Sequence, residues 1–217
     1  MTERTATNGR AGASARREGE RRQAQREARM RERHPRIGGV ILALQEAPQH
    51  ERSWARGAGG EELVAQALTK HCPDIPVLHD RRIPSSRANI DHIAIAATGV
   101  WVIDTKRYKG KLQVAKPLFG KPMLKVAGRD RSKLVDGLAK QVDLVTAAVA
   151  DIGLAVPVHG CLCFVDTELP LLGTPSISGV RIFGRRGLAR QLNAAGGLTP
   201  EAAAALALHL AERFPPA

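Results

Sequence analysis

Two aspartates and a lysine, Asp91, Asp104 and Lys106, have the types and spacing to hold a divalent metal ion beside a positive charge. They lie in or next to two apolar runs, residues 90–97 and 100–105, which are separated by a short turn that contains a glycine. Two such runs around a glycine-containing turn predict a β-hairpin.

The register of this hairpin decides how close the three side chains come. One register pairs Ala96 with Gly99. In that register Asp91 lies opposite Asp104, with Cβ atoms roughly 5 Å apart. Lys106 is two residues further along the strand and points to the same face. If the turn slips by one residue, Asp91 faces Lys106 instead, and the three side chains still cluster. Two carboxylates this close repel each other unless a cation lies between them, so a divalent metal site is the first functional hypothesis.

An earlier helix offers a third carboxylate. Glu61 and Glu62 lie at its start, where the helix dipole favours acids with no ligand involved. Combined with the hairpin acids, a carboxylate here would complete the oxygen-rich site that Mg²⁺ prefers. A metal ion makes its bound water a better nucleophile, and a lysine stabilises negative charge in the transition state. The set therefore suits phosphodiester hydrolysis. The plain alternative is that Asp104 and Lys106 form a surface ion pair worth under about 1 kcal/mol.

The chain divides by composition into residues 1–56 and residues 57–217. The first part contains Arg and Glu but neither Lys nor Asp, and it carries a net positive charge. Residues 14–33 would accept a helix but lack an apolar stripe, so we expect a basic arm that is helical or disordered. The apolar stretch 37–44 is too short for a bilayer, which needs about 20 apolar residues.

The second part is expected to fold as one domain. Its order of helix, strands, helix, strand, strand and helices predicts an α/β architecture with a mixed central sheet flanked by helices. Helices are predicted over residues 60–71, 131–152, 185–193 and 200–214, and strands over 77–79, the hairpin, 111–114, 123–126, 156–165 and 180–183.

The charge and the cysteines limit the classes of partner. The chain has 217 residues, a formal net charge of +12 and a pI near 10.5. Such a charge attracts polyanions, with nucleic acid expected ahead of anionic lipid. Cys72, Cys161 and Cys163 form no disulfide framework, so we expect buried thiols in a reducing cytoplasm and no secretion.

Four motifs taken together are specific: Gly57-Ala58-Gly59-Gly60-Glu61, Asn89-Ile90-Asp91-His92, Gly99-Val100-Trp101-Val102-Ile103-Asp104-Thr105-Lys106 and Tyr108-Lys109-Gly110. This set resembles the nuclease-related domain, known as NERD, over about residues 56–164. The NERD domain is assigned to the PD-(D/E)xK restriction-endonuclease-like superfamily. The resemblance implies a restriction-endonuclease-like core and metal-dependent nuclease activity.

The resemblance also implies roles for individual residues. Glu61 matches the glutamate of the family's first helix, and Asp91 matches its metal-binding aspartate. Asp104 and Lys106 match the (D/E)xK acid and lysine, although many relatives have Glu in place of Asp104. Gln141 matches a glutamine on the long helix that follows the core strands.

By this resemblance the cofactor would be Mg²⁺ or Mn²⁺, held by Glu61, Asp91, Asp104 and the carbonyl of Thr105. Lys106 would position and activate the attacking water. Gln141 would orient Lys106 or a phosphate.

Basic residues beside the predicted site would contact the nucleic-acid backbone. They are Arg107, Lys109 and Lys111, and for any one of them alone solvated loop charge is the favoured explanation. Backbone contacts carry no base specificity, so the expected partner is nucleic acid, with DNA first. The main alternative is a catalytically inactive nucleic-acid-binding module of the same fold. Membrane association through the basic arm and residues 37–44 is a third possibility that we do not expect.

Overall fold

The computed structural model describes residues 8–33, 49–86, 88–115, 117 and 120–217. The apolar stretch 37–44 lies outside the described residues. None of the described helices combines the length and the apolar character needed to cross a bilayer.

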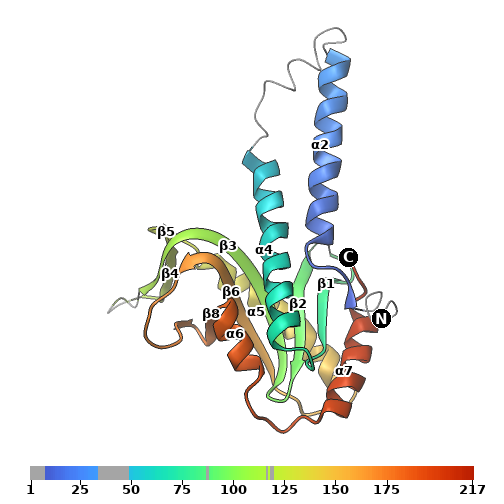
Figure 1. Ribbon diagram of the computed structural model, residues 1–217, viewed down its shortest axis with the longest axis vertical. Coiled ribbons are helices and arrows are strands. Elements are labelled where there is room, and N and C mark those ends of the chain that lie inside the picture. Colours follow the sequence, from blue (N-terminus) through green and yellow to red (C-terminus); the bar gives the residue numbers. More distant parts are fainter. Residues whose placement is uncertain (1–7, 34–48, 87, 116, 118–119) are drawn as a thin grey trace.

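One mixed sheet organises the molecule (Figure 1). Its strands follow the order β1-β2-β3-β6-β8-β7, and β4 and β5 extend it from the far part of β3. Strands β1, β2 and β3 are antiparallel, whereas β3, β6 and β8 are parallel. The bounds are Val77–Arg82 for β1, Asn89–Ala96 for β2, Gly99–Ala115 for β3, Met123–Val126 for β4, Arg129–Asp130 for β5, Val158–Glu168 for β6, Ser176–Ile177 for β7 and Val180–Gly184 for β8.

Helices cover both faces of this sheet and enclose two apolar cores. Helices α5 (Lys133–Ala150) and α7 (Pro200–Arg213) bury one face, where β3 contributes Val100 and Val102. Helices α4 (Gln49–His71) and α6 (Arg185–Leu192) bury the other face, where β3 contributes Trp101 and Ile103. Side chains alternate along a strand, so every residue of β3 is assigned to one face or the other.

The predicted α/β architecture with a mixed sheet is confirmed, and two element predictions are corrected. The strand predicted over residues 111–114 is the far part of β3. Between Lys106 and Lys111 the strand has no buried residue, so the sequence shows no apolar alternation that would indicate its continuation. The helix predicted from residue 60 begins at Gln49, so α4 passes through the compositional boundary at residue 57. The first part of α4 was missed because glycines lie at its centre, and glycine has low helix propensity.

One of these glycines has a packing role. A Cβ atom on Gly60 would lie 3.1 Å from Cβ of Arg107, so the missing side chain lets α4 lie close against β3. Gly160 does the same on the other face, where a Cβ atom would lie 2.7 Å from Cγ2 of Val142 on α5. Both faces of the sheet thus bring a helix close to the middle of the sheet.

The basic arm includes a helix, α2 (Ala13–Arg33), which runs beside α4 (Figure 1). Its first residues are anchored to β1. The amide and hydroxyl of Ser14 both donate to the Asp80 carboxylate, each at 2.6 Å. Arg16 pairs with Glu62 of α4. The start of the arm is therefore packed on the domain through polar contacts. This packing was not predicted from the sequence, because the arm has no apolar stripe.

Candidate active site

The hairpin has the first of the two predicted registers. Ala96 pairs with Gly99, and the pairing continues to His92 opposite Ile103. This places Asp91 beside the end of that ladder, where its carboxylate accepts a hydrogen bond of 2.7 Å from the Thr105 amide. The slipped register is excluded.

Asp104 and Lys106 point to the same face of β3, as the period of a strand requires. The Lys106 ammonium donates to Oδ1 of Asp104 at 2.5 Å and to the Thr105 carbonyl at 3.2 Å. Asp104 is buried, and its side chain is only 10% exposed. Thr105 points the opposite way, toward Gly60 of α4.

Glu61 reaches the same place from α4. A cavity of about 500 Å³ is lined by Glu61, Asp91, Thr105 and Lys106, together with Ala15, Arg56, Gly57, Arg107, Tyr108 and Arg131. The Glu61 carboxylate accepts a hydrogen bond of 2.9 Å from the Gly12 amide, which belongs to the arm. The arm therefore borders the cavity.

Burial and the charges of neighbouring acids raise the pKa values of two of these carboxyl groups. The pKa of Asp91 is raised well above its usual value by burial and then by the charges of Asp104 and Glu61. The pKa of Glu61 is raised to about 7 by burial and by the charge of Asp80. For Lys106, burial favours the neutral amine, but Asp104 and Asp91 outweigh it and the net pKa is raised. The lysine therefore stays a cation at neutral pH.

These donors fit a hard divalent cation in their chemistry. Three carboxylates face one ammonium group, and the excess negative charge that raises the pKa of Asp91 is what a metal ion would neutralise. As they stand, however, no three His, Cys, Asp or Glu side chains within the described part of the chain come close enough to hold a metal ion. Asp104, Asp91 and Glu61 each bond a protein donor instead.

Gln141 lies on α5, half-buried, and is not among the residues that line the cavity. Its Oε1 atom is buried without a hydrogen-bond partner among the described residues. A buried amide oxygen with no donor is costly, so it marks a position where a donor is missing. The role of Gln141 toward Lys106 or a phosphate stays a prediction.

The three predicted backbone-binding residues differ in their surroundings. Arg107 pairs with Asp166 at 2.7 Å, whereas Lys109 and Lys111 are exposed. Arg107 and Lys109 line a second cavity of about 360 Å³, which shares Arg56, Arg107 and Tyr108 with the first. Basic charge thus continues from the candidate site along β3.

Two neighbours of the site were not found from the sequence. Asp80 holds Ser14 and raises the pKa of Glu61, and Gly12 bonds Glu61. A third neighbour, Arg131, is one of the basic residues that follow the hairpin in the sequence, and it lies over the Tyr108 ring at 4.7 Å. His92 is buried, with its Nδ1 atom 2.8 Å from Nδ1 of His79. Sequence spacing carries no signal for contacts between segments this far apart.

A family model for the nuclease-related domain, NERD, matches residues 56–165, about half of the chain. This chain belongs to the NERD family. An uncharacterised protein of Bacillus anthracis is 41% identical to it over 66 residues, which are 29% of this chain and 31% of that protein. The matched part is thus less than a third of that relative's length. No solved structure matches the chain.

The NERD match begins in α4 and ends in β6. It therefore includes every residue that the sequence assigned to the candidate site, from Glu61 to Gln141. The NERD domain belongs to the restriction-endonuclease-like superfamily, and the mixed sheet with flanking helices is consistent with that core. All of α2, strands β7 and β8 and helices α6 and α7 lie outside the match.

Proposed function

We propose that this protein is a metal-dependent nuclease that hydrolyses phosphodiester bonds in DNA. The observation that carries the proposal is the convergence of Asp91 and Lys106 from the hairpin with Glu61 from α4 on one cavity, beside Asp104. Membership of a nuclease-related family and the net charge of +12 support it.

In this proposal the acids and the lysine have separate tasks. Glu61, Asp91, Asp104 and the Thr105 carbonyl would hold Mg²⁺ or Mn²⁺, which lowers the pKa of water and so supplies the nucleophile. Lys106 is a cation with a raised pKa, so it suits holding the phosphate and stabilising its developing negative charge better than removing a proton.

A plasmid-cleavage assay with Mg²⁺ or Mn²⁺ tests the activity. Asp104→Asn should abolish cleavage, because it removes a carboxylate charge and the ion-pair partner of Lys106. Asp143→Asn, an equal charge change at an exposed position on α5, should cleave as the wild type does. Single-stranded DNA and RNA substrates in the same assay identify the preferred nucleic acid. Equal cleavage by wild type and Asp104→Asn, or none on any substrate, would refute the proposal.

The alternative is a nucleic-acid-binding module without turnover. It is favoured by the hydrogen bonds that already occupy Glu61, Asp91 and Asp104, and by the lack of a three-acid group at metal-binding distance among the described residues. Salt-sensitive DNA binding that is unchanged by Mg²⁺, with no cleavage, would select this alternative.

A further inference from the structure

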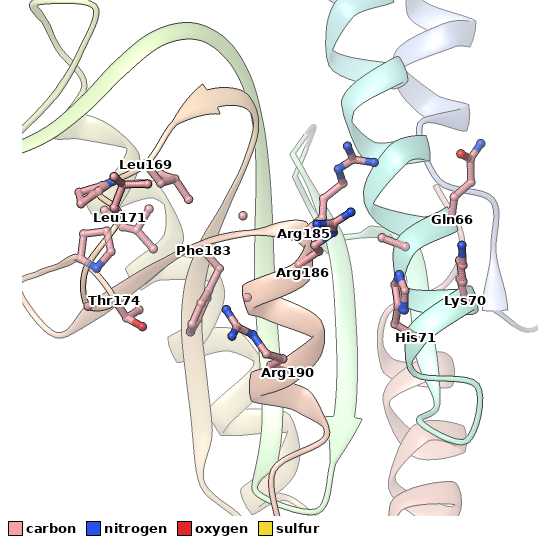
Figure 2. A pocket seen from close by; sticks show the side chains of 17 residues that line it. Gln66, Lys70, His71, Leu169, Leu171, Thr174, Phe183, Arg185, Arg186 and Arg190 are labelled. Atoms are coloured by element: carbon pink, nitrogen blue, oxygen red, sulfur yellow. The ribbon is translucent and has the colours of Figure 1, made fainter.

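A large basic cavity lies at the edge of the NERD match, between α4, which the match includes, and α6 and the loop 169–175, which it does not (Figure 2). Its volume is about 670 Å³. Lys70 and His71 of α4 and three arginines of α6, Arg185, Arg186 and Arg190, line it. Figure 2 shows these arginines between helix α4 and the loop that carries Leu169 and Leu171. No Asp or Glu lines the cavity.

The three arginines have no acidic partner in the described part of the chain. Arg185, Arg186 and Arg190 are all exposed, and none forms an ion pair or a hydrogen bond there. Three guanidinium groups on a helix of eight residues repel one another, and a bound anion removes that repulsion.

The position of the arginines on α6 opposes local stability. Arg185 and Arg186 begin the helix, at its positive end, where the dipole favours acids. The N-cap residue is Gly184, which provides no side-chain cap for the first amides. Cations and uncapped amides at one helix start disfavour the helix but attract a phosphate.

Strand register connects this cavity to the candidate active site. Lys106 of β3 pairs with Phe164 of β6, and Phe164 pairs with Gly184 of β8 in parallel. Two strand spacings separate Lys106 from Gly184, so their Cα atoms are about 10 Å apart. Gly184 ends β8, so the cavity lies at the carboxyl end of a parallel strand, where ligands of open sheets bind.

Further basic residues follow Lys106 along β3. Arg107 follows Lys106 on β3 and points to the opposite face, toward α4. It lines the cavity of about 360 Å³ with Lys109 and Arg56, and with Asp166, which pairs with Arg107 and leaves Arg56 and Lys109 as the cations of that cavity. A strand of nucleic acid carries one negative charge per nucleotide, so a strand that reaches both sites presents phosphates to each of them.

We infer that the α4–α6 cavity binds backbone phosphates of the same nucleic-acid strand that contacts Lys106. The inference rests on the proposed function for the identity of the strand. The subsite binds phosphate groups without reading bases, because its charged groups are arginine and lysine side chains at a helix start.

Binding measured in EDTA tests the subsite without any cleavage. A labelled DNA oligonucleotide is titrated with wild type, with the double variant Arg185→Gln and Arg190→Gln, and with the control Lys140→Gln and Arg213→Gln, which removes two exposed charges from α5 and α7. The α6 variant should bind about tenfold more weakly, or about 1.4 kcal/mol. Its salt dependence should fall by about 1.5 in slope, since each lost phosphate contact contributes about 0.7–0.9. The control should match the wild type.

Unchanged affinity and salt slope in the α6 variant would overturn the inference. Loss of binding in that variant together with absent cleavage by the wild type would uphold the subsite and reject the nuclease proposal alone.

Leu171 and Leu172 are almost fully exposed beside the cavity, so a lipid headgroup is the competing source of phosphate. Flotation with phosphatidylserine vesicles that the α6 variant abolishes, combined with unchanged DNA affinity, would assign the cavity to lipid instead. Inorganic phosphate that binds the wild type as tightly as DNA would assign it to free anions.

Discussion

At the scale of residues, the candidate site is held by hydrogen bonds from within the protein. Asp91 is bonded to the Thr105 amide, Asp104 to the Lys106 ammonium and Glu61 to the Gly12 amide. Only the second of these donors carries a positive charge. Burial raises the pKa values of Asp91 and Glu61 first, and the charges of neighbouring acids raise them further.

Glu61→Gln tests this electrostatic strain in metal-free protein. The folded-state pKa of Glu61 is about 7 and the ordinary value is 4.5. Between these values the folded state binds more protons than the unfolded state, so the contribution of Glu61 to stability falls as pH rises. Glutamine removes the charge and keeps an oxygen for the Gly12 amide.

Urea denaturation in EDTA should show Glu61→Gln equal to the wild type below pH 4.5 and more stable above pH 7, where the pKa of Glu61 lies. The gain is on the order of 1–3 kcal/mol. Glu212→Gln, an exposed change on α7, controls for loss of a carboxylate. A stability difference that is constant across this pH range would contradict the assigned cause.

At the scale of elements, the hairpin of β2 and β3 and the helix α4 determine where the site residues lie. The hairpin could be predicted because its two strands are neighbours in sequence and their turn contains a glycine. The extension of β3 beyond Lys106 could not, because residues 106–111 are mostly polar and none of them is fully buried. The start of α4 was missed for a related reason, since its glycines pack against β3 rather than showing helix propensity.

Two glycine substitutions distinguish packing from propensity. Gly160→Ala places a methyl group against Val142 of α5 and should destabilise the protein by about 1–3 kcal/mol. Gly137→Ala, at an exposed position within α5 where nothing lies within 4 Å, should stabilise it by about 0.5–1 kcal/mol. Midpoints of urea denaturation at equal m-values measure both. Shifts of the same sign in the two variants would show that α5 does not depend on the close approach at Gly160.

At the scale of the whole molecule, contacts distant in sequence join the arm to the domain. Ser14 and Asp80 are 66 residues apart, and Gly12 and Glu61 are 49 apart. The partners of each bond lie in separate segments of the sequence, so no local pattern could have predicted the contact. The result is that the described start of the arm borders the candidate site.

Gly12→Ala tests this docking. Gly12 has φ +70°, and a Cβ atom there would lie 2.9 Å from the Ala58 backbone. The variant should release the start of α2 and increase hydrogen exchange throughout the helix. Gly153→Ala shares the positive φ, at +68°, but meets nothing within 4 Å, so it should leave α2 protected. Equal protection of α2 in both variants would contradict the docking.

The continuity of β3 limits where related proteins can gain or lose residues. The register between β3 and β6 shifts between Arg107 and Gly110, and the strand then pairs with β4 through Leu112, which packs in the core. Losing one residue between Lys106 and Leu112 would turn Leu112 outward, because side chains alternate along a strand. Residues added in the turn between β4 and β5 would not alter this alternation. Insertions should therefore accumulate at the turn between β4 and β5 during evolution, while the number of residues between Lys106 and Leu112 stays fixed.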